Sequence, residues 1–136
     1  MTFYEHELMK IFGDSMLLSA DTTSSGKTMI SKIGKDIRAK IQFVTTNVAD
    51  NYDTLKVSII NRTEGVIDEQ RFRFVDIMGV KNGVAPHVWE CSHEKTDWYR
   101  YHPTDRDYEK IQAEIEGYIE MFADVQQTYG FEMSMM

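Results

Sequence analysis

The sequence has little that would indicate a secreted, disulfide-bonded or membrane-spanning protein. Its 136 residues contain a single cysteine, Cys91, which cannot form an internal disulfide. The first residues, MTFYEHELMKIFG, carry charges and lack the apolar run and small-residue cleavage site of a secretory signal. No uncharged apolar stretch reaches the length of about 20 residues that a spanning helix needs. We therefore expect a cytoplasmic protein without a membrane role.

Motifs of catalysis and of metal binding are also scarce. The chain has neither a CxxC nor an HExxH pattern. The segment SGKT at residues 25–28 resembles the end of a phosphate-binding loop, but Asp21 stands where such a loop needs a glycine. A strand-like segment also follows it, where the loop needs a helix. We predict no catalytic residue, no metal and no cofactor, and we favour a binding protein over an enzyme.

One alternative stays open, namely a small-ligand site or enzyme pocket formed by aromatic, thiol and imidazole side chains. Its members would be Trp89, Cys91, His93, Trp98 and His102. Two residues apart on a strand, Cys91 and His93 would project to the same side and could share an ion. The simpler interpretation is a small buried cysteine beside surface imidazoles.

The chain does contain enough apolar material for one folded domain. It is 42% hydrophobic and 27% charged, and a chain of this size buries roughly two-thirds of the surface that it exposes when unfolded. We expect a single α+β domain over residues 1–136. The small polar residues of ADTTSSG predict a flexible loop at 20–26, and the methionine-rich end predicts a frayed tail at 130–136.

Two segments have the periodicity of amphipathic helices. Thr2 and Glu5 form a capping-box pattern ahead of a predicted helix over 2–12. Thr104 can cap a second helix over 105–124, in which apolar residues recur at three- and four-residue spacings. Asp105 and Asp107 in its first turn suit the positive end of the helix dipole.

The segments between the helices alternate between apolar and polar residues, as strands with one buried side do. Predicted strands cover 28–33, 36–43, 53–61 and 70–77, and a predicted hairpin joins 87–91 to 96–101. The connections, including 61–69, are short and carry the Asn, Asp and Gly of turns, which favours antiparallel neighbours. The simplest arrangement is an antiparallel sheet of about five or six strands with the long C-terminal helix, and the N-terminal one, on its apolar side.

The formal net charge of −7 conceals an uneven distribution. If the strands pair as proposed, five cations point away from the helices: Arg38, Lys40, Lys56, Arg71 and Arg73. Such a face could bind an anionic ligand or an acidic partner, although solubility alone also explains charges on an open sheet. Direct binding of nucleic acid is disfavoured, because no aromatic residue interleaves with these cations to stack bases.

The long C-terminal helix has the opposite sign. Its outward residues Glu109, Glu114, Glu116 and Glu120 predict an anionic surface. Such a surface could imitate the phosphates of DNA, while glutamates on an exposed helix face are also the ordinary outcome.

A dense aromatic cluster precedes this helix. Trp98, Tyr99 and Tyr101 alternate in the sequence WYRY, so that a strand here would leave part of the aromatic surface exposed. An exposed aromatic surface predicts a protein partner. A small secondary core between a hairpin and the start of a helix is the alternative.

Two stretches of the chain carry a resemblance to known proteins. They are 48–68, VADNYDTLKVSIINRTEGVID, and 96–124, TDWYRYHPTDRDYEKIQAEIEGYIEMFAD, with NRTEG at 61–65 and WYxYxPT at 98–104 as their marks. The chain resembles a group of small uncharacterised proteins carried on mobile genetic elements of Gram-positive gut bacteria. The resemblance implies an accessory protein of a plasmid, conjugative element or phage, and it gives no functional residue that could be carried over to this chain.

We therefore interpret the chain as a non-enzymatic accessory protein that acts through a macromolecular partner. A protein is the expected partner, and self-association is a further option. Inhibition of a host defence system is one specific form of this hypothesis.

Overall fold

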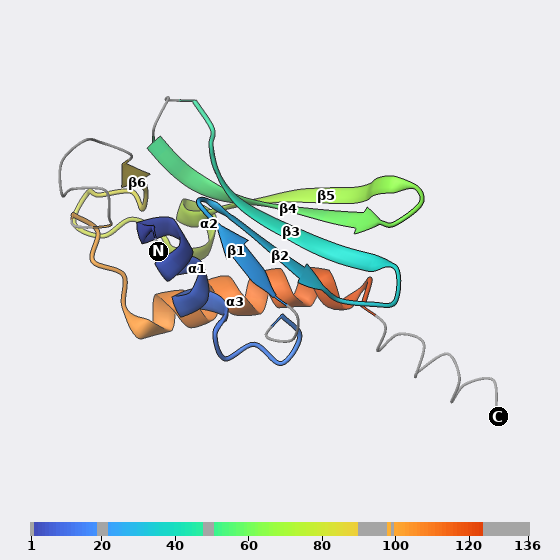
Figure 1. Ribbon diagram of the computed structural model, residues 1–136. Helices are drawn as coiled ribbons and strands as arrows, with labels where there is room; N and C mark the ends of the chain where they lie inside the picture. The colour runs from blue at the N-terminus through green and yellow to red at the C-terminus, as the bar shows by residue number, and fades with distance from the viewer. Residues whose placement is uncertain (1, 19–21, 48–50, 90–97, 99, 124–136) are drawn as a thin grey trace.

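The computed structural model describes residues 2–18, 22–47, 51–89, 98 and 100–123, and these form the predicted α+β arrangement of a sheet and helices (Figure 1). In chain order the elements are α1 (Phe3–Phe12), β1 (Thr23–Ser25), β2 (Thr28–Lys32), β3 (Ile37–Thr45), β4 (Asn51–Asn61), β5 (Gly65–Arg73), α2 (Phe74–Met78), β6 (Val88–Trp89) and α3 (Asp105–Glu120). None of the helices in this part of the chain has the length and apolar character needed to cross a membrane.

The strands form an antiparallel sheet in the order β1-β2-β3-β4-β5, so each strand pairs with its neighbour in sequence. The short strand β6 pairs with the start of β4 at Asn51 and Tyr52, just beyond Thr54, where the pairing of β4 with β5 ends. The predicted antiparallel pairing of the central strands is confirmed.

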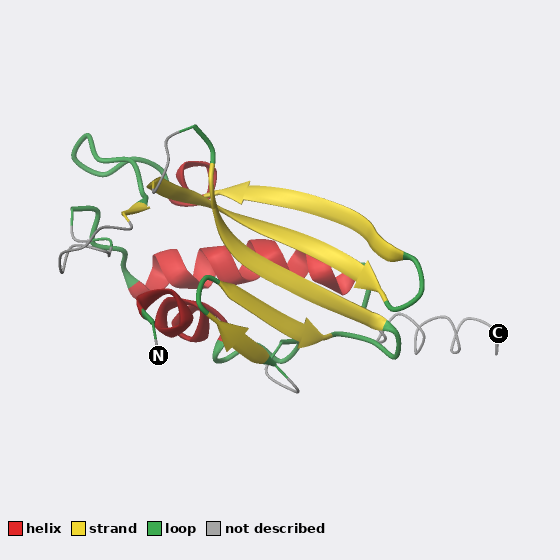
Figure 2. Cartoon of the chain, turned by 45° about the horizontal axis from the view of Figure 1, so that its top comes forward, coloured by secondary structure: helices red, strands yellow, loops and turns green. Residues whose placement is uncertain are grey.

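The helices α1 and α3 cover one face of the sheet, and no helix of the described residues lies on the other face (Figures 1 and 2). The core between the layers consists of alternate residues of the central strands and one side of α3. Its members include Ala39, Ile41, Phe43, Leu55, Val57, Ile59, Ile111, Ile115 and Ile119, each almost completely buried. Burying each of the large apolar side chains contributes about 1.5–3 kcal/mol, so this layer contact fixes which face of the sheet stays open.

The ends of both long helices follow local chemistry. Thr2 and Thr104 each accept a bond from the backbone N–H three residues later, and Glu5 and Asp107 return it, so both predicted N-terminal caps are confirmed. The C-terminal end of α3 at Glu120 lies before the predicted 124, because the N–H groups of 121–123 bond three residues back, in the manner of a tightened last turn.

The predicted flexible loop at 20–26 is wrong in its second half. Thr23–Ser25 forms β1, which joins β2 through a two-residue turn at Gly26 and Lys27. Gly26 adopts a positive φ of 61°, which is the requirement of a Gly-X hairpin turn and costs glycine little. The first half of that loop and the predicted tail at 130–136 lie largely outside the described residues.

The predicted strand at 70–77 is also wrong in its bounds. The strand β5 begins at Gly65 and ends at Arg73, so the turn before it is much shorter than the predicted 61–69. The chain then enters α2, whose Phe74 and Met78 are buried. A bulge places Asp68 opposite Ile59 but Val66 opposite Ile60, so one residue of β5 is left without a partner.

The predicted hairpin from 87 to 101 does not form as expected where the structure describes it. Its first half shortens to β6, which pairs with β4 instead. At its other end the N–H groups of Tyr101 and His102 both donate to the carbonyl of Trp98 at 2.8 Å, which makes a turn rather than a strand. Residues 90–97 and 99 lie outside the described part.

Candidate anion-binding surface

The open face of the sheet brings together the five cations that the sequence placed there. Lys56 lies directly opposite Arg71, and Arg38 lies opposite Ile60, which is four residues from Lys56 on the same side of β4. The same alternation places Lys40 and Arg73 on this face. The residues that form the cationic face are Lys32, Arg38, Lys40, Lys56, Arg71 and Arg73. Lys32 was not among the predicted site residues, although it lies directly opposite Arg38.

One acid, Glu69, shares this face among the residues paired in the strand register. Its carboxylate lies 3.9 Å from Lys56 Nζ and 3.7 Å from Arg71 Nη1, and it accepts a hydrogen bond of 3.1 Å from the Ser58 hydroxyl. Ion pairs this long and this exposed are weak. Glu69 therefore neutralises only part of the charge at the β5 side of the face.

The remaining cations of the face have no ion pair with any described residue; they are Lys32, Arg38, Lys40 and Arg73. Their charges lie on a surface that water reaches, so they are solvated in the free protein. An incoming anion would find donors that need not first be released from internal partners.

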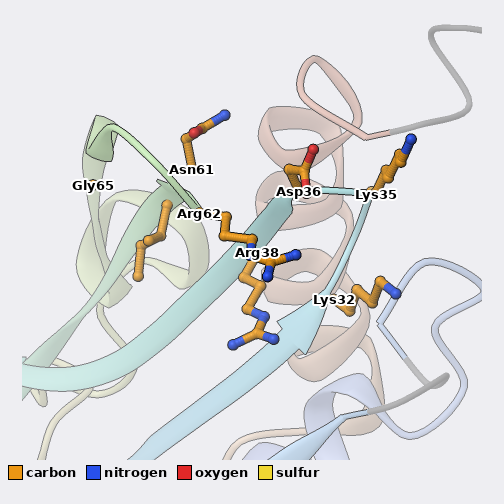
Figure 3. Close-up of a pocket in the computed structure, with 9 residues that line it drawn as sticks. Lys32, Lys35, Asp36, Arg38, Asn61, Arg62 and Gly65 are labelled. Carbon is orange, nitrogen blue, oxygen red and sulfur yellow. The ribbon is translucent and has the colours of Figure 1, made fainter.

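A pocket of about 600 Å³ opens at the end of this face, where the β2–β3 and β4–β5 turns come together. Its lining residues are Lys32, Gly34, Lys35, Asp36, Arg38, Ile60, Asn61, Arg62 and Gly65. Figure 3 shows Arg38 and Arg62 in the middle of this set, with Lys32 and Lys35 on one side and Asn61 and Gly65 on the other. Four cations and one acid thus surround a space of ligand size.

Backbone hydrogen bonds tie the two turns of the pocket to each other. The N–H of Arg62 donates to the carbonyl of Asp36 at 2.9 Å, which joins the β4–β5 turn to the β2–β3 turn. The N–H groups of Ile33 and Gly34 both donate to the carbonyl of Ile37, at 3.0 and 3.1 Å. The pocket is therefore set on a bonded frame, not on two independent loops.

The side chain of Asn61 holds the second turn in shape. Its Oδ1 accepts from the N–H of Thr63 at 2.9 Å, the hydroxyl of Thr63 at 2.8 Å and the N–H of Glu64 at 3.1 Å. An asparagine that bonds the backbone two and three residues on is typical of tight turns. This turn sets the direction in which Arg62 leaves the backbone.

Sequence reasoning missed Lys35 and Arg62 as site residues. Both lie in turns, where strand alternation makes no statement about direction. The available signal was a basic residue in each of two hairpin turns, because an antiparallel meander brings alternate turns to the same end of the sheet.

The aromatic residues that the sequence proposed as a binding surface are placed differently. Trp98 and Tyr101 are 4% and 3% exposed, so these two side chains supply no aromatic surface. The Trp98 indole donates to Glu7 at 2.9 Å, and the Tyr101 hydroxyl donates to the carbonyls of Met78 and Gly79. Burial is tolerated because each polar group has a partner. Tyr99 lies outside the described residues.

The alternative pocket can be followed only in part. Trp98 is buried in the core, whereas His102 is exposed, so these two side chains do not line a common space. Trp89 belongs to β6, and its backbone pairs with Asn51 of β4. Cys91 and His93 lie outside the described residues. Within the described ranges, no group of three His, Cys, Asp or Glu side chains could hold a metal ion.

The SGKT segment forms the β1–β2 hairpin turn. The N–H of Gly26 donates to Glu5 at 3.1 Å, and the backbone bonds of Gly26 and Thr2 lower the pKa of the Glu5 carboxyl. The carboxylate of Glu5 thus occupies the backbone N–H that a phosphate would need. The turn is also followed by the strand β2, where a phosphate-binding loop needs a helix.

Three of the four glutamates predicted on the outer surface of α3 are exposed. Glu109, Glu114 and Glu120 are exposed, but Glu116 accepts a hydrogen bond from Ser15. Two exposed basic residues, Arg106 and Lys110, lie in the first turns of α3. The cationic face, by contrast, carries a single acid.

Comparison of the chain with protein-family models, with curated proteins and with solved structures finds no match.

Proposed function

We propose that the protein acts by binding an acidic partner protein through the cationic face of its sheet. The observation that carries this proposal is the excess of six cations over one acid on a face that none of the described helices covers. A charged patch of one sign attracts a partner of the opposite sign and orients it on approach.

The charge balance favours a compact acidic protein surface over a nucleic acid. The face carries +5, which leaves −12 for the rest of a chain whose total is −7. A DNA duplex carries its charge on a stiff rod, so any part that extended beyond the face would meet this acidic remainder, whereas a flexible acidic chain can avoid it. In addition, none of the outward positions in the pairings among β2, β3, β4 and β5 is aromatic, so bases would find no stacking surface on these strands.

The resemblance to mobile-element proteins adds a setting to the proposal. In that setting the chain is a non-enzymatic accessory protein of the cytoplasm that occupies a host component, and a host defence protein is the narrowest form of such a target. Self-association belongs to the same proposal, and the mass of the protein in solution tests it, since a dimer doubles the monomer mass of 15.9 kDa.

Charge reversal tests the binding surface. We expect poly-L-glutamate of about 20 residues to bind the wild type, and the double variant Arg38→Glu, Arg71→Glu to bind it at least about tenfold more weakly, because like charges then face the ligand. The matched control reverses Arg106 and Lys110 on α3, which lies in the other layer, and should leave the affinity unchanged. Binding would be measured by fluorescence anisotropy at two salt concentrations.

Two outcomes contradict the proposal. Either both double variants lose affinity equally, or a DNA duplex of the same charge binds the wild type more tightly than poly-L-glutamate. A pull-down from host extract then extends the test: an acidic protein should be retained by the wild type and the α3 control and lost with Arg38→Glu, Arg71→Glu.

A further inference from the structure

We propose that the pocket between the β2–β3 and β4–β5 turns binds a compact phosphate anion with two or more negative charges, such as a diphosphate group. This inference rests on the proposed function, because it names a ligand group for one end of the cationic face. It depends, however, on Lys35 and Arg62, which lie in turns outside that face.

The charge of the pocket sets the charge of the ligand. Lys32, Lys35, Arg38 and Arg62 line it with Asp36 as the sole acid, which leaves a net charge of +3. None of the four cations has an ion pair with a described residue. A monoanion would neutralise only a third of this excess, whereas a diphosphate supplies two to three negative charges within a few ångströms.

The kind of donor favours oxyanions. Arg38 extends from β3 and Arg62 from the β4–β5 turn, and both guanidinium groups belong to the lining of one pocket (Figure 3). Each guanidinium presents a planar set of donors that matches two oxygens of a phosphate. The ammonium groups of Lys32 and Lys35 add charge without a fixed geometry, as lysines do at phosphate sites.

The lining argues against a large organic ligand. Ile60 provides the single apolar side chain among the nine lining residues, and no aromatic ring is among them. Ligand pockets for drug-sized molecules are mostly apolar. A volume of about 600 Å³ lined by four basic side chains and no aromatic ring therefore suits a hydrated, compact anion, and it offers a nucleobase nothing to stack on.

The pocket is continuous with the open face. Lys32 and Arg38 also line a second hollow of about 340 Å³ with Thr23 and Ile30. A phosphate in the pocket could therefore belong to a small free molecule or to a phosphorylated side chain of the partner bound on the face. The ligand chemistry is the same in both cases.

Calorimetric titration with inorganic pyrophosphate tests the pocket. We expect the wild type to bind it, and Lys35→Gln, Arg62→Gln to reduce the affinity at least about tenfold. Both side chains are exposed, so the fold should be retained, and the single variant Arg62→Gln repeats the test with less change. Arg106→Gln removes one exposed charge from α3, in the other layer and outside the pocket lining, and should change the affinity less than twofold.

The inference is overturned if pyrophosphate does not bind the wild type, or if Arg106→Gln weakens binding as much as Arg62→Gln does. It is also overturned if citrate binds as tightly as pyrophosphate, because the pocket would then select charge and not phosphate. The double variant Lys35→Gln, Arg62→Gln should still bind poly-L-glutamate, because its cationic face is unchanged. This measurement separates a failure of the present inference from a failure of the proposed function.

A peptide pair distinguishes the two sources of the phosphate. A glutamate-rich peptide with two phosphoserines is compared with its unphosphorylated form. A gain in affinity that Lys35→Gln, Arg62→Gln abolishes supports a phosphate carried by the partner. Tight pyrophosphate binding without such a gain supports a free ligand.

Discussion

Charged side chains have different surroundings on the two sides of the sheet. On the helix side, Glu7 is 5% exposed, and its Oε1 accepts from the Trp98 indole at 2.9 Å and the Tyr108 hydroxyl at 2.7 Å. On the open side, Arg38 and Arg73 have no ion pair with any described residue. The first kind of charge is bonded within the fold, whereas the second has no ion-pair partner among the described residues.

The same contrast holds for two further acids on the helix side. Asp68 accepts from the Tyr118 hydroxyl, and Asp107 accepts from Lys81. Burial, together with hydrogen bonds to carboxylates, raises the pKa of both Tyr118 and Tyr108. Each acid thus connects elements distant in sequence, and its removal should affect stability more than binding.

The largest expected effect concerns Glu7. In Glu7→Ala the indole of Trp98 and the hydroxyl of Tyr108 lose their acceptor in the core. Hydrogen bonds to charged groups contribute about 1.5–3 kcal/mol each, and unsatisfied buried donors are costly. We expect the free energy of unfolding in urea to fall by about 3 kcal/mol.

Two variants sharpen this prediction. Glu7→Gln retains an acceptor oxygen and should cost less than Glu7→Ala. Glu109→Ala removes an exposed glutamate from α3 and should change stability by about 0.5 kcal/mol at most. If Glu7→Ala were no more destabilising than Glu109→Ala, the bonds of Glu7 would not support the fold.

The second effect is a dependence on pH. Burial alone would raise the pKa of Asp107, but the hydrogen bonds from Lys81 and Thr104 outweigh it and hold the pKa below its usual 3.8. A lowered folded-state pKa contributes stability above the usual value, and this contribution is lost as pH falls through the folded-state pKa. We expect Asp107→Asn to cost about 2 kcal/mol near pH 6.

The difference between wild type and Asp107→Asn should then narrow as unfolding is measured at decreasing pH, towards pH 2. Asp105→Asn is the control, because this carboxylate lies in the same helical turn but is exposed. A gap that stayed constant from pH 6 to pH 2 would exclude the ion pair with Lys81 as its source.

Local patterns were sufficient to predict most of the helix-covered side. The caps at Thr2 and Thr104 need only residues within one turn, and alternation in 36–43 and 53–61 identifies which side is buried. The five cations of the open face follow from the same alternation, since a strand that buries Ile41 must turn Lys40 outward.

Prediction failed where the structure depends on distant contacts. All but one of the side chains of β5 are exposed, so an edge strand of this kind has little alternation to detect. Trp98 was assigned to a strand, but its position depends on Glu7, 91 residues away. Lys35 and Arg62 meet because two turns lie at one end of the sheet, and no local pattern reports that.

The smallest expected effect concerns Glu69 on the open face of the sheet. Glu69 is the one acid among its register-paired residues, and its contacts with Lys56 and Arg71 are long and partly exposed. Glu69→Gln should therefore lower the free energy of unfolding by only about 0.5 kcal/mol. Because the face then carries +6 instead of +5, its affinity for poly-L-glutamate should rise by about two- to threefold at low salt.

Glu64→Gln, in the nearby turn and outside the face, is the matched control for net charge. Equal gains from both variants would show that the net charge of the whole chain, and not the arrangement of charges on the open face, controls binding.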